Sequence, residues 1–255
     1  MQQEVIYEQP LTERIRTFLR LEYLLRQAEN HVHCDSRWDS HATVVTLIDM
    51  LNILGRSDIK SELLKELERL GNVLHGLEQN PQVDAHKLRT LADDLDILID
   101  RLYALQGPLG SRLKKNEMFN SVRQRIAIPG GNCDFDLPTY HFWLSKPTAE
   151  RRRDLQEWLD DLDPLGPAIK RILGLIRDSS GFTYQVAEGG FFQQTLDPTL
   201  PCLLIRVALP QECPYYAEIS GGKHRFSVRF LEQKIFDKDA QVAKNIEFRL
   251  TCCTL

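Results

Sequence analysis

The sequence predicts an α+β protein with a mostly helical domain followed by a smaller antiparallel β-sheet domain. Apolar side chains recur at helical spacing through most of the first two thirds of the 255 residues, and at every second position in several segments after Gly181. Two neighbouring segments also repeat leucine in steps typical of packed helices. We place the helical domain at 11–125 and the β domain, with flanking helices, at 126–255, with an N-terminal strand at 3–8 joining the latter.

The first helix is expected at 11–29, where apolar residues cover a broad face and charged residues form a stripe opposite it. Arg16 and Arg20 are four positions apart and therefore share that polar stripe. After a polar loop at 30–36, a second helix is expected to end at the C-cap glycine Gly55.

The next two helices form a predicted antiparallel hairpin. Asn80-Pro81 is a turn signal between them, and Asp84 can cap the start of the second helix. Their leucine seam packs either within one subunit or against a second copy of the chain. The seam consists of Leu63, Leu67, Leu70, Leu74 and Leu77 on one helix and Leu88, Leu91, Leu95, Leu98, Leu102 and Leu105 on the other.

Shorter helices follow the hairpin. One is expected at 113–125, before the turn at Pro129-Gly130-Gly131. Another is expected at 148–162 with Thr148 as its N-cap, and a short helix follows through Ile169 and Ile176.

The β domain shows three strands in which apolar and polar residues alternate, at 203–209, 226–231 and 246–252. Gly189-Gly190 and Gly221-Gly222 mark turns. The apolar residues at 5–7 can add an N-terminal strand to the same sheet.

Composition favours a cytoplasmic protein without nucleic acid or membrane partners. The net charge is -4, so a broad nucleic-acid-binding face is not the default expectation. The N-terminus lacks the pattern of a signal peptide, and no apolar run is long enough to cross a membrane. The six scattered cysteines are therefore expected to be reduced thiols.

Motifs of nucleotide binding, hydrolysis or metalloprotease chemistry are absent, so we expect no enzyme, cofactor or metal. Three weaker patterns have plainer interpretations. His31, His33, Cys34 and His41 match no zinc spacing and fit a solvated loop; Ile128–Gly131 fits a turn better than a phosphate cradle; and the adjacent Cys252 and Cys253 fit free thiols on opposite faces of a strand.

Basic residues gather in three places: the first helix, the segment before the Pro-Gly-Gly turn, and the strands. Such clusters are usually solvated faces, but arginine and histidine around a groove would suit an acidic peptide. The run at 151–153 looks structural or solubilising. The clusters are Arg14, Arg16 and Arg20; Lys114, Lys115, Arg123, Arg125 and His141; and Arg206, Arg225, Arg229 and Arg249.

Four segments spread over the chain carry a resemblance to a known family. They are Tyr7–Glu22, Leu63–Leu67, Val122–Leu144 with the motif RQRIAIPGGNCDFDLP, and Ile219–Phe230 together with the closing Leu250–Cys253. In these segments the chain resembles the ZapD family of bacterial cell division proteins.

The resemblance implies a non-enzymatic homodimer, with a helical and a β domain, that is recruited from the cytoplasm to the division site at mid-cell. It implies binding to the C-terminal tail of FtsZ, the tubulin-like division protein. A two-fold dimer has two such sites and can therefore cross-link FtsZ protofilaments into bundles, which promotes Z-ring assembly and stability during septation.

The same resemblance implies which residues bind the tail. Arg20 and His141 match family positions with that role, and Arg123 and Arg125 match too but could instead brace the domain junction. Relatives can have an arginine where Glu117 stands here, and the neighbouring lysines can supply that charge without arginine's bidentate geometry. The full candidate set is Arg16, Arg20, Lys114, Lys115, Arg123, Arg125, His141 and Arg229.

Two other functions remain open from the residues alone. An enzyme of unrecognised type would need a deep pocket with convergent polar groups. A nucleic-acid-binding adaptor would use the basic face of the sheet formed by Arg206, Arg229 and Arg249, and its DNA binding would depend steeply on salt.

Overall fold

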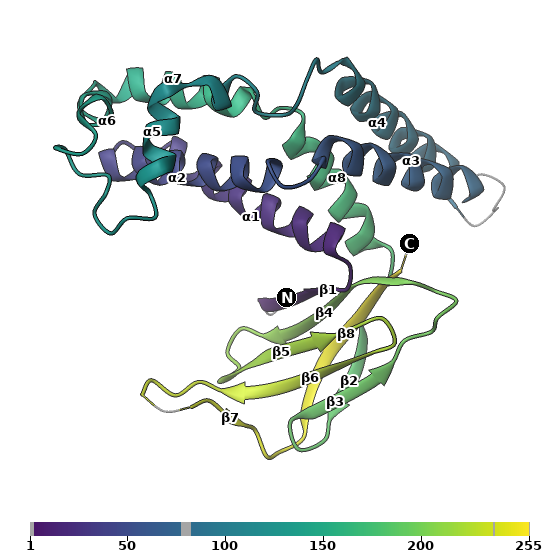
Figure 1. Cartoon of the computed structure of the whole chain (residues 1–255). Coiled ribbons are helices and arrows are strands. Elements are labelled where there is room, and N and C mark those ends of the chain that lie inside the picture. The colour runs from purple at the N-terminus through teal and green to yellow at the C-terminus, as the bar shows by residue number, and fades with distance from the viewer. Residues whose placement is uncertain (1–2, 78–82, 237, 255) are drawn as a thin grey trace. The chain divides into compact units, whose positions relative to one another are not determined.

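The computed structural model describes residues 3–77, 83–236 and 238–254, and in these ranges it confirms the predicted α+β fold (Figure 1). The chain divides into two compact units, each described by itself. We call the residues up to Thr17 and from Leu173 onward the sandwich unit, and Phe18–Ile172 the helical unit. The chain passes from one unit to the other inside the helices α1 and α8, so residues 126–172 cluster with the helical unit.

The helices are separated by short loops. Their bounds are α1 Glu13–Val32, α2 Arg37–Leu54, α3 Ile59–Leu77, α4 Ala85–Ala104, the 3-10 turn η1 Leu113–Lys115, α5 Glu117–Arg125, α6 Pro138–Leu144, α7 Thr148–Asp160 and α8 Leu165–Asp178.

The first loop is shorter than the sequence predicted. The expected polar loop at 30–36 narrows to 33–36, because α1 continues to Val32 and α2 begins at Arg37. The Ser36 side chain caps α2 by accepting a hydrogen bond from the Asp39 amide at 3.0 Å. This bond satisfies an amide that has no partner within the helix and so stabilises the start of α2 at Arg37.

The predicted helical hairpin is formed by α3 and α4, which lie side by side in Figure 1. Asp84 caps α4 as expected, accepting from the His86 and Lys87 amides. The turn signal Asn80-Pro81 lies outside the described residues. The leucines at the centre of the seam, Leu63, Leu67, Leu70, Leu74, Leu88, Leu95, Leu98 and Leu102, are buried within a single chain.

Aromatic rings connect α5, α6 and α7. Phe119 meets Trp158 edge-on at 4.8 Å between ring centroids, Trp158 lies 5.2 Å from Trp143, and Trp143 stacks on Tyr140. Such packed rings hold one another in fixed orientations.

The expectation that Thr148 is the N-cap of α7 was wrong, because Pro147 occupies the N-cap position and Thr148 is the first helical residue.

The strands form two antiparallel four-stranded sheets rather than one. One sheet has the order β1-β4-β8-β2, and the other has β3-β6-β5 with the short β7 on the far side of β6 from β5. The bounds are β1 Glu4–Pro10, β2 Thr183–Ala187, β3 Phe191–Thr195, β4 Cys202–Pro210, β5 Tyr215–Gly221, β6 Arg225–Glu232, β7 Ala240–Gln241 and β8 Ile246–Thr254.

The two sheets share one hydrophobic core, which makes this unit a β-sandwich. Inward-facing side chains such as Val207, Val228 and Phe248 are almost completely buried, and the Phe230 and Phe248 rings lie 5.0 Å apart across it. The N-terminal strand β1 pairs with β4 along its whole length, from Glu4 opposite Pro210 to Pro10 opposite Leu204. The first residues of the chain therefore belong to the same unit as the last strands.

Candidate functional site

The segment before the Pro-Gly-Gly turn presents its basic side chains from a 3-10 turn and a short helix. Asn116 ends η1 and caps α5, because its side-chain oxygen accepts a hydrogen bond from the Phe119 amide at 3.1 Å. Lys114 and Lys115 lie on η1, and Arg123 lies on α5. In the part of the chain that the structure describes, these three side chains make no ion pair or side-chain hydrogen bond, and Lys115 and Arg123 are exposed.

Arg125 and His141 are differently placed, because each has a carboxylate partner in the loop between α5 and α6. Arg125 donates to Asp136 at 2.7 Å, and the His141 Nδ1 lies 2.8 Å from the Asp134 carboxylate. The loop geometry depends on Gly131, where a Cβ would lie 2.6 Å from the Arg125 carbonyl oxygen. An acidic ligand at these two side chains would have to displace Asp134 and Asp136.

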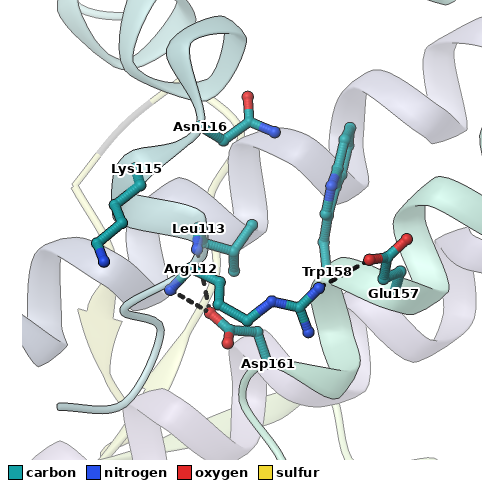
Figure 2. A pocket seen from close by; sticks show the side chains of 7 residues that line it. All are labelled: Arg112, Leu113, Lys115, Asn116, Glu157, Trp158 and Asp161. Carbon is teal, nitrogen blue, oxygen red and sulfur yellow. Dashed lines mark hydrogen bonds and ion pairs between the residues drawn. The ribbon is translucent and has the colours of Figure 1, made fainter. Parts of the chain in front are cut away.

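A small pocket lies beside η1 and faces α7 (Figure 2). Its volume is about 240 Å³, and its walls are Arg112, Leu113, Lys115, Asn116, Glu157, Trp158 and Asp161. The Asp161 carboxylate accepts hydrogen bonds from the backbone amides of Arg112 and Leu113 at 3.1 Å each, which fixes η1 against the end of α7. The Arg112 guanidinium is paired with Glu157 at 2.8 Å.

On α1, one of the two candidate arginines has an acidic partner and the other has none. Arg16 donates to Glu13 at 3.2 Å one turn earlier, whereas the exposed Arg20 forms no ion pair or hydrogen bond with any described residue. No hydrogen bond or ion pair in the described ranges joins Arg20 to the basic residues of η1, α5 and α6.

Three of the four arginines expected on the sandwich strands have acidic partners, whereas the exposed Arg225 on β6 has none among the described residues. Arg229 on β6 pairs with Glu218, its cross-strand neighbour on β5, at 2.6 Å. Arg206 donates to Glu8 on β1 at 2.9 Å, and Arg249 pairs with Glu4 of the same strand. Arg206 and Arg249 also lie over the Phe182 ring, at 5.3 and 5.0 Å from its centroid. Glu218 and Glu4 each offset the charge of one arginine, whereas Glu8 is shared between Arg206 and Arg177.

Comparison with known protein families identifies the group to which the chain belongs. The family model described as ZapD, cell division protein, matches residues 19–229. The chain is 47% identical over its full length to the cell division protein ZapD of Methylococcus capsulatus, and both proteins are covered completely. The chain belongs to the ZapD family.

Other ZapD proteins match the chain with similar completeness. The cell division protein ZapD of Coxiella burnetii is 38% identical over 98% of both chains. That of Azoarcus is 35% identical over 98% of this chain and all of the relative. The family resemblance inferred from the sequence motifs is thus confirmed, and with it a role in cell division. The name of these relatives is not that of an enzyme.

The histidines and the cysteine near the start of α2, considered above as metal ligands, contact different groups. The His31 Nδ1 lies 2.9 Å from Asp39, the Cys34 thiol donates to the Asn30 carbonyl, and the His41 Nδ1 lies 2.8 Å from the Tyr140 hydroxyl. The pKa of Asp39 is lowered, first by the hydrogen bond from Ser36 and then by His31. Within 3–77, 83–236 and 238–254, no group of three or more histidine, cysteine, aspartate or glutamate side chains could hold a metal ion.

The adjacent Cys252 and Cys253 point to opposite faces of β8, as the sequence suggested. Cys253 is buried, and that burial raises its pKa to about 11. The Cys252 thiol interacts with Cys202 of β4, and the hydrogen bond from Cys202 lowers the pKa of Cys252.

Among the described helices, none is both long and apolar enough to span a membrane.

His41 gives a test of the packing of α2 against α6. Its burial lowers its pKa below the usual 6.5, so the folded protein protonates it at a lower pH than the unfolded chain does. As the pH falls through 6.5 the unfolded chain takes up a proton that the folded chain does not, and stability decreases. We therefore expect the free energy of unfolding to fall less between pH 7.5 and 5.5 in His41→Gln than in the unchanged protein, measured by urea unfolding. Equal decreases in both proteins would contradict this assignment.

Sequence reasoning missed the pocket and the acidic partners. No sequence pattern marked Arg112, Glu157, Trp158 or Asp161 as site residues. Asp134 and Asp136 stand inside the family motif, so their presence next to Arg125 and His141 was a usable signal of internal pairing. The pocket had no such signal, because its two sides are more than 40 residues apart in the chain.

Proposed function

We propose that this ZapD protein binds the C-terminal tail of FtsZ through exposed basic side chains and that a homodimer of it cross-links FtsZ protofilaments at the division site. One observation carries the proposal beyond family membership. Four of the eight candidate basic side chains, Arg20, Lys114, Lys115 and Arg123, have no acidic partner among the described residues. They are therefore available to an acidic peptide without loss of an internal ion pair.

The basic face of the sandwich does not support the alternative, a nucleic-acid adaptor. Each of Arg206, Arg229 and Arg249 has a glutamate partner. A duplex would have to compete with those carboxylates for each arginine, in a chain of net charge -4.

The proposed dimer needs a surface other than the leucine seam, because the central seam leucines are already buried between α3 and α4 of one chain. Bivalency is nevertheless what converts tail binding into cross-linking. Light scattering at micromolar concentration is expected to give the mass of a dimer of the 29.5 kDa chain. A monomer mass would rule out cross-linking by a two-fold dimer.

Co-sedimentation with GTP-assembled FtsZ tests the function directly. We expect the protein to pellet with intact FtsZ and to bundle its filaments, and to remain in the supernatant with FtsZ that lacks its C-terminal tail. Pelleting with both forms would place the binding site elsewhere on FtsZ. Failure to pellet with either form would refute the proposal.

Arg20→Ala is expected to weaken binding to a tail peptide about tenfold, or about 1.4 kcal/mol, by removing a charge-assisted hydrogen bond. The fold should be unaffected because Arg20 is exposed. Arg26→Ala is the matched control, since Arg26 is an exposed arginine of the same helix on a different face. Fluorescence anisotropy with a labelled peptide measures both affinities, and an equal effect of the two substitutions would exclude a specific role for Arg20.

A further inference from the structure

Two thiols meet between neighbouring strands of the sandwich unit. Cys202 is the first residue of β4, and Cys252 lies near the end of β8, which pairs with β4 in antiparallel register. Both side chains are half-buried and pack against the same sandwich core, so they project from the same face of their sheet. Neither is in a disulfide, and a hydrogen bond joins their sulfur atoms.

The pairing of β4 with β8 explains why these short side chains meet. Cys202 is opposite Thr254, and Cys252 is opposite Ile205, with a shift in register just after Cys202. Regular diagonal neighbours are roughly 7–8 Å apart, so the irregular backbone at Cys202 accounts for the contact. A disulfide needs Cα atoms about 4.4–6.8 Å apart. Both residues lie close to strand ends, which open more readily than strand centres, so a small movement can supply that geometry.

The other cysteines have no hydrogen-bonded thiol partner in the described chain. Cys253 is buried and points to the opposite face of β8. The thiols of Cys34 and Cys133 donate to oxygen atoms, and Cys213 accepts from a tyrosine hydroxyl. The contact between β4 and β8 therefore distinguishes one pair from the remaining thiols.

The hydrogen bond makes the two sulfur atoms chemically unequal. Cys202 donates to Cys252, which lowers the pKa of Cys252, while the same bond together with burial raises the pKa of Cys202. The thiolate is the form of cysteine that attacks an oxidant, so Cys252 is the more reactive sulfur. Cys202 stands in contact with it as a second thiol. Because both side chains are only half-buried, a small oxidant can reach them.

We infer that Cys202 and Cys252 form a reversible oxidation site, in which a hydroperoxide such as hydrogen peroxide converts the two thiols into a disulfide. This inference goes beyond the proposed function and does not depend on it. The bond would close a loop that contains β5, β6 and β7. Closing a loop restricts the unfolded chain more than the folded one, so the oxidised sandwich unit should open less readily.

The reaction has two steps. The Cys252 thiolate first attacks one oxygen of hydrogen peroxide, so that an S–O bond forms, the O–O bond breaks and the leaving hydroxide takes up a proton to become water. The Cys202 sulfur then attacks the sulfenic sulfur of Cys252, so that the S–S bond forms, the S–O bond breaks and the departing hydroxide takes the Cys202 proton. The two thiols lose two electrons, and the peroxide is reduced to two waters.

Peptide mapping tests this assignment. The full-length protein is treated with hydrogen peroxide, its remaining thiols are blocked with N-ethylmaleimide under denaturing conditions, and its peptides are identified by mass spectrometry. We expect a pair of peptides joined through Cys202 and Cys252, which dithiothreitol separates, with Cys253 alkylated. A dominant bond between Cys252 and Cys253, a bond between two chains, or a Cys202–Cys252 bond no more abundant than bonds to Cys213 would overturn the inference.

Serine variants assign the roles of the two sulfurs. Cys202→Ser should lose the cross-link and accumulate the sulfenic acid of Cys252, with about tenfold more labelling by dimedone than in the unchanged protein. Cys213→Ser is the matched control, because Cys213 is also half-buried and packs against the same core. It should keep the cross-link. Loss of the cross-link in both variants, or no increase of labelling in Cys202→Ser, would contradict the assignment.

Hydrogen exchange shows whether the bond belongs to the folded sandwich. Peptides from β6 should exchange at least about tenfold more slowly in the oxidised protein, and dithiothreitol should restore the original rate. Exchange that stays the same or becomes faster would show that the bond forms only in a distorted sheet, and would overturn the site.

Discussion

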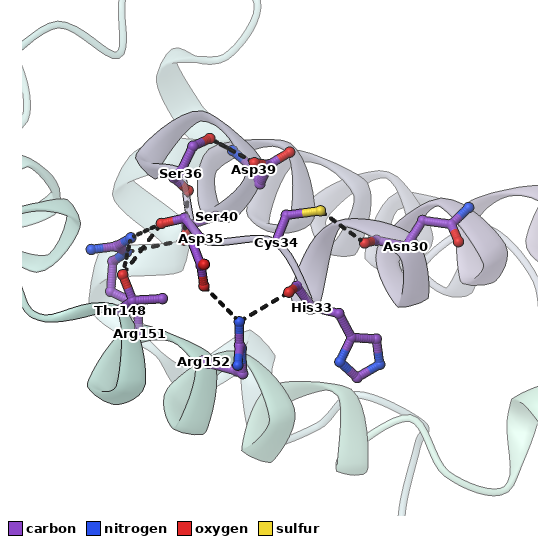
Figure 3. A network of polar contacts seen from close by, with 10 residues as sticks. All are labelled: Asn30, His33, Cys34, Asp35, Ser36, Asp39, Ser40, Thr148, Arg151 and Arg152. Atoms are coloured by element: carbon purple, nitrogen blue, oxygen red, sulfur yellow. Dashed lines mark hydrogen bonds and ion pairs between the residues drawn. The ribbon is translucent and has the colours of Figure 1, made fainter.

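Replacement of Arg151 by alanine is expected to lower the free energy of unfolding by about 3 kcal/mol. Arg151 is only 4% exposed and forms the centre of a polar network between α7 and the start of α2 with the residues just before it (Figure 3). Its guanidinium donates to the Ser40 hydroxyl at 3.0 Å, to the Asp35 carbonyl at 2.8 Å and to the Lys146 carbonyl. Alanine would open a cavity and leave the buried Ser40 hydroxyl and two part-buried carbonyls without their donor, and an unsatisfied buried polar group costs about 1–3 kcal/mol.

The neighbouring Arg152 provides the matched control. It also bonds to this segment, through the His33 carbonyl and the Asp35 carboxylate, but its side chain is 44% exposed. Water replaces its partners when it is removed, so Arg152→Ala should cost less than about 1 kcal/mol. The three tryptophans all lie in the helical unit, so their fluorescence during urea unfolding reports on this unit. Equal costs for the two substitutions would contradict the central role of Arg151.

Replacement of Gly190 by alanine is expected to destabilise the sandwich unit by roughly 3–5 kcal/mol. Gly190 has a φ of +72°, and a Cβ there would lie 2.1 Å from the Val242 carbonyl oxygen. The segments that contain Gly190 and Val242 are both hydrogen-bonded to Phe230 of β6. The Phe230 amide donates to the Gly190 carbonyl, and the Val242 amide donates to the Phe230 carbonyl. The added methyl group would therefore separate backbone segments on which the edge of β6 depends.

Gly189→Ala isolates the steric part of this effect. Gly189 also has a positive φ, +54°, but nothing lies within 4 Å of where its Cβ would be. Gly189→Ala should lower the free energy of unfolding only by the cost of placing alanine in the left-handed conformation, about 1–2 kcal/mol. Hydrogen exchange followed by mass spectrometry on peptides from β6 measures the loss of protection, which should be much larger for Gly190→Ala. Similar protection in the two variants would exclude the close approach of Val242.

Regular, half-buried elements were predictable from the sequence. The strands at 203–209, 226–231 and 246–252 became β4, β6 and β8, because one face of each packs into the sandwich core and forces apolar residues onto alternate positions. The edge strands β5, β2 and β3 were missed, and the last two show why. Most of their side chains are exposed, so packing imposes no alternating pattern on them.

For the candidate binding residues, too, the sequence did not reveal which contacts the fold makes. The motifs identified the family and the eight basic residues, but they did not distinguish the paired Arg125 and His141 from the unpaired Arg20 and Lys115. Whether a charge is available to a ligand depends on what the fold places within a few ångströms of it, and that distance has no fixed relation to spacing along the chain.

The sequence by itself determined the α+β class, the helical hairpin, the central strands and membership of the ZapD family, because periodicity and local motifs encode them. Only the tertiary structure decided that the apparently equivalent Arg151 and Arg152 are buried and exposed, that Glu8 neutralises Arg206 from 198 residues away, and that η1 and α7 enclose a pocket. The physical reason is that burial and ion pairing are set by contacts between distant segments, whereas secondary structure is set largely by neighbours in the chain.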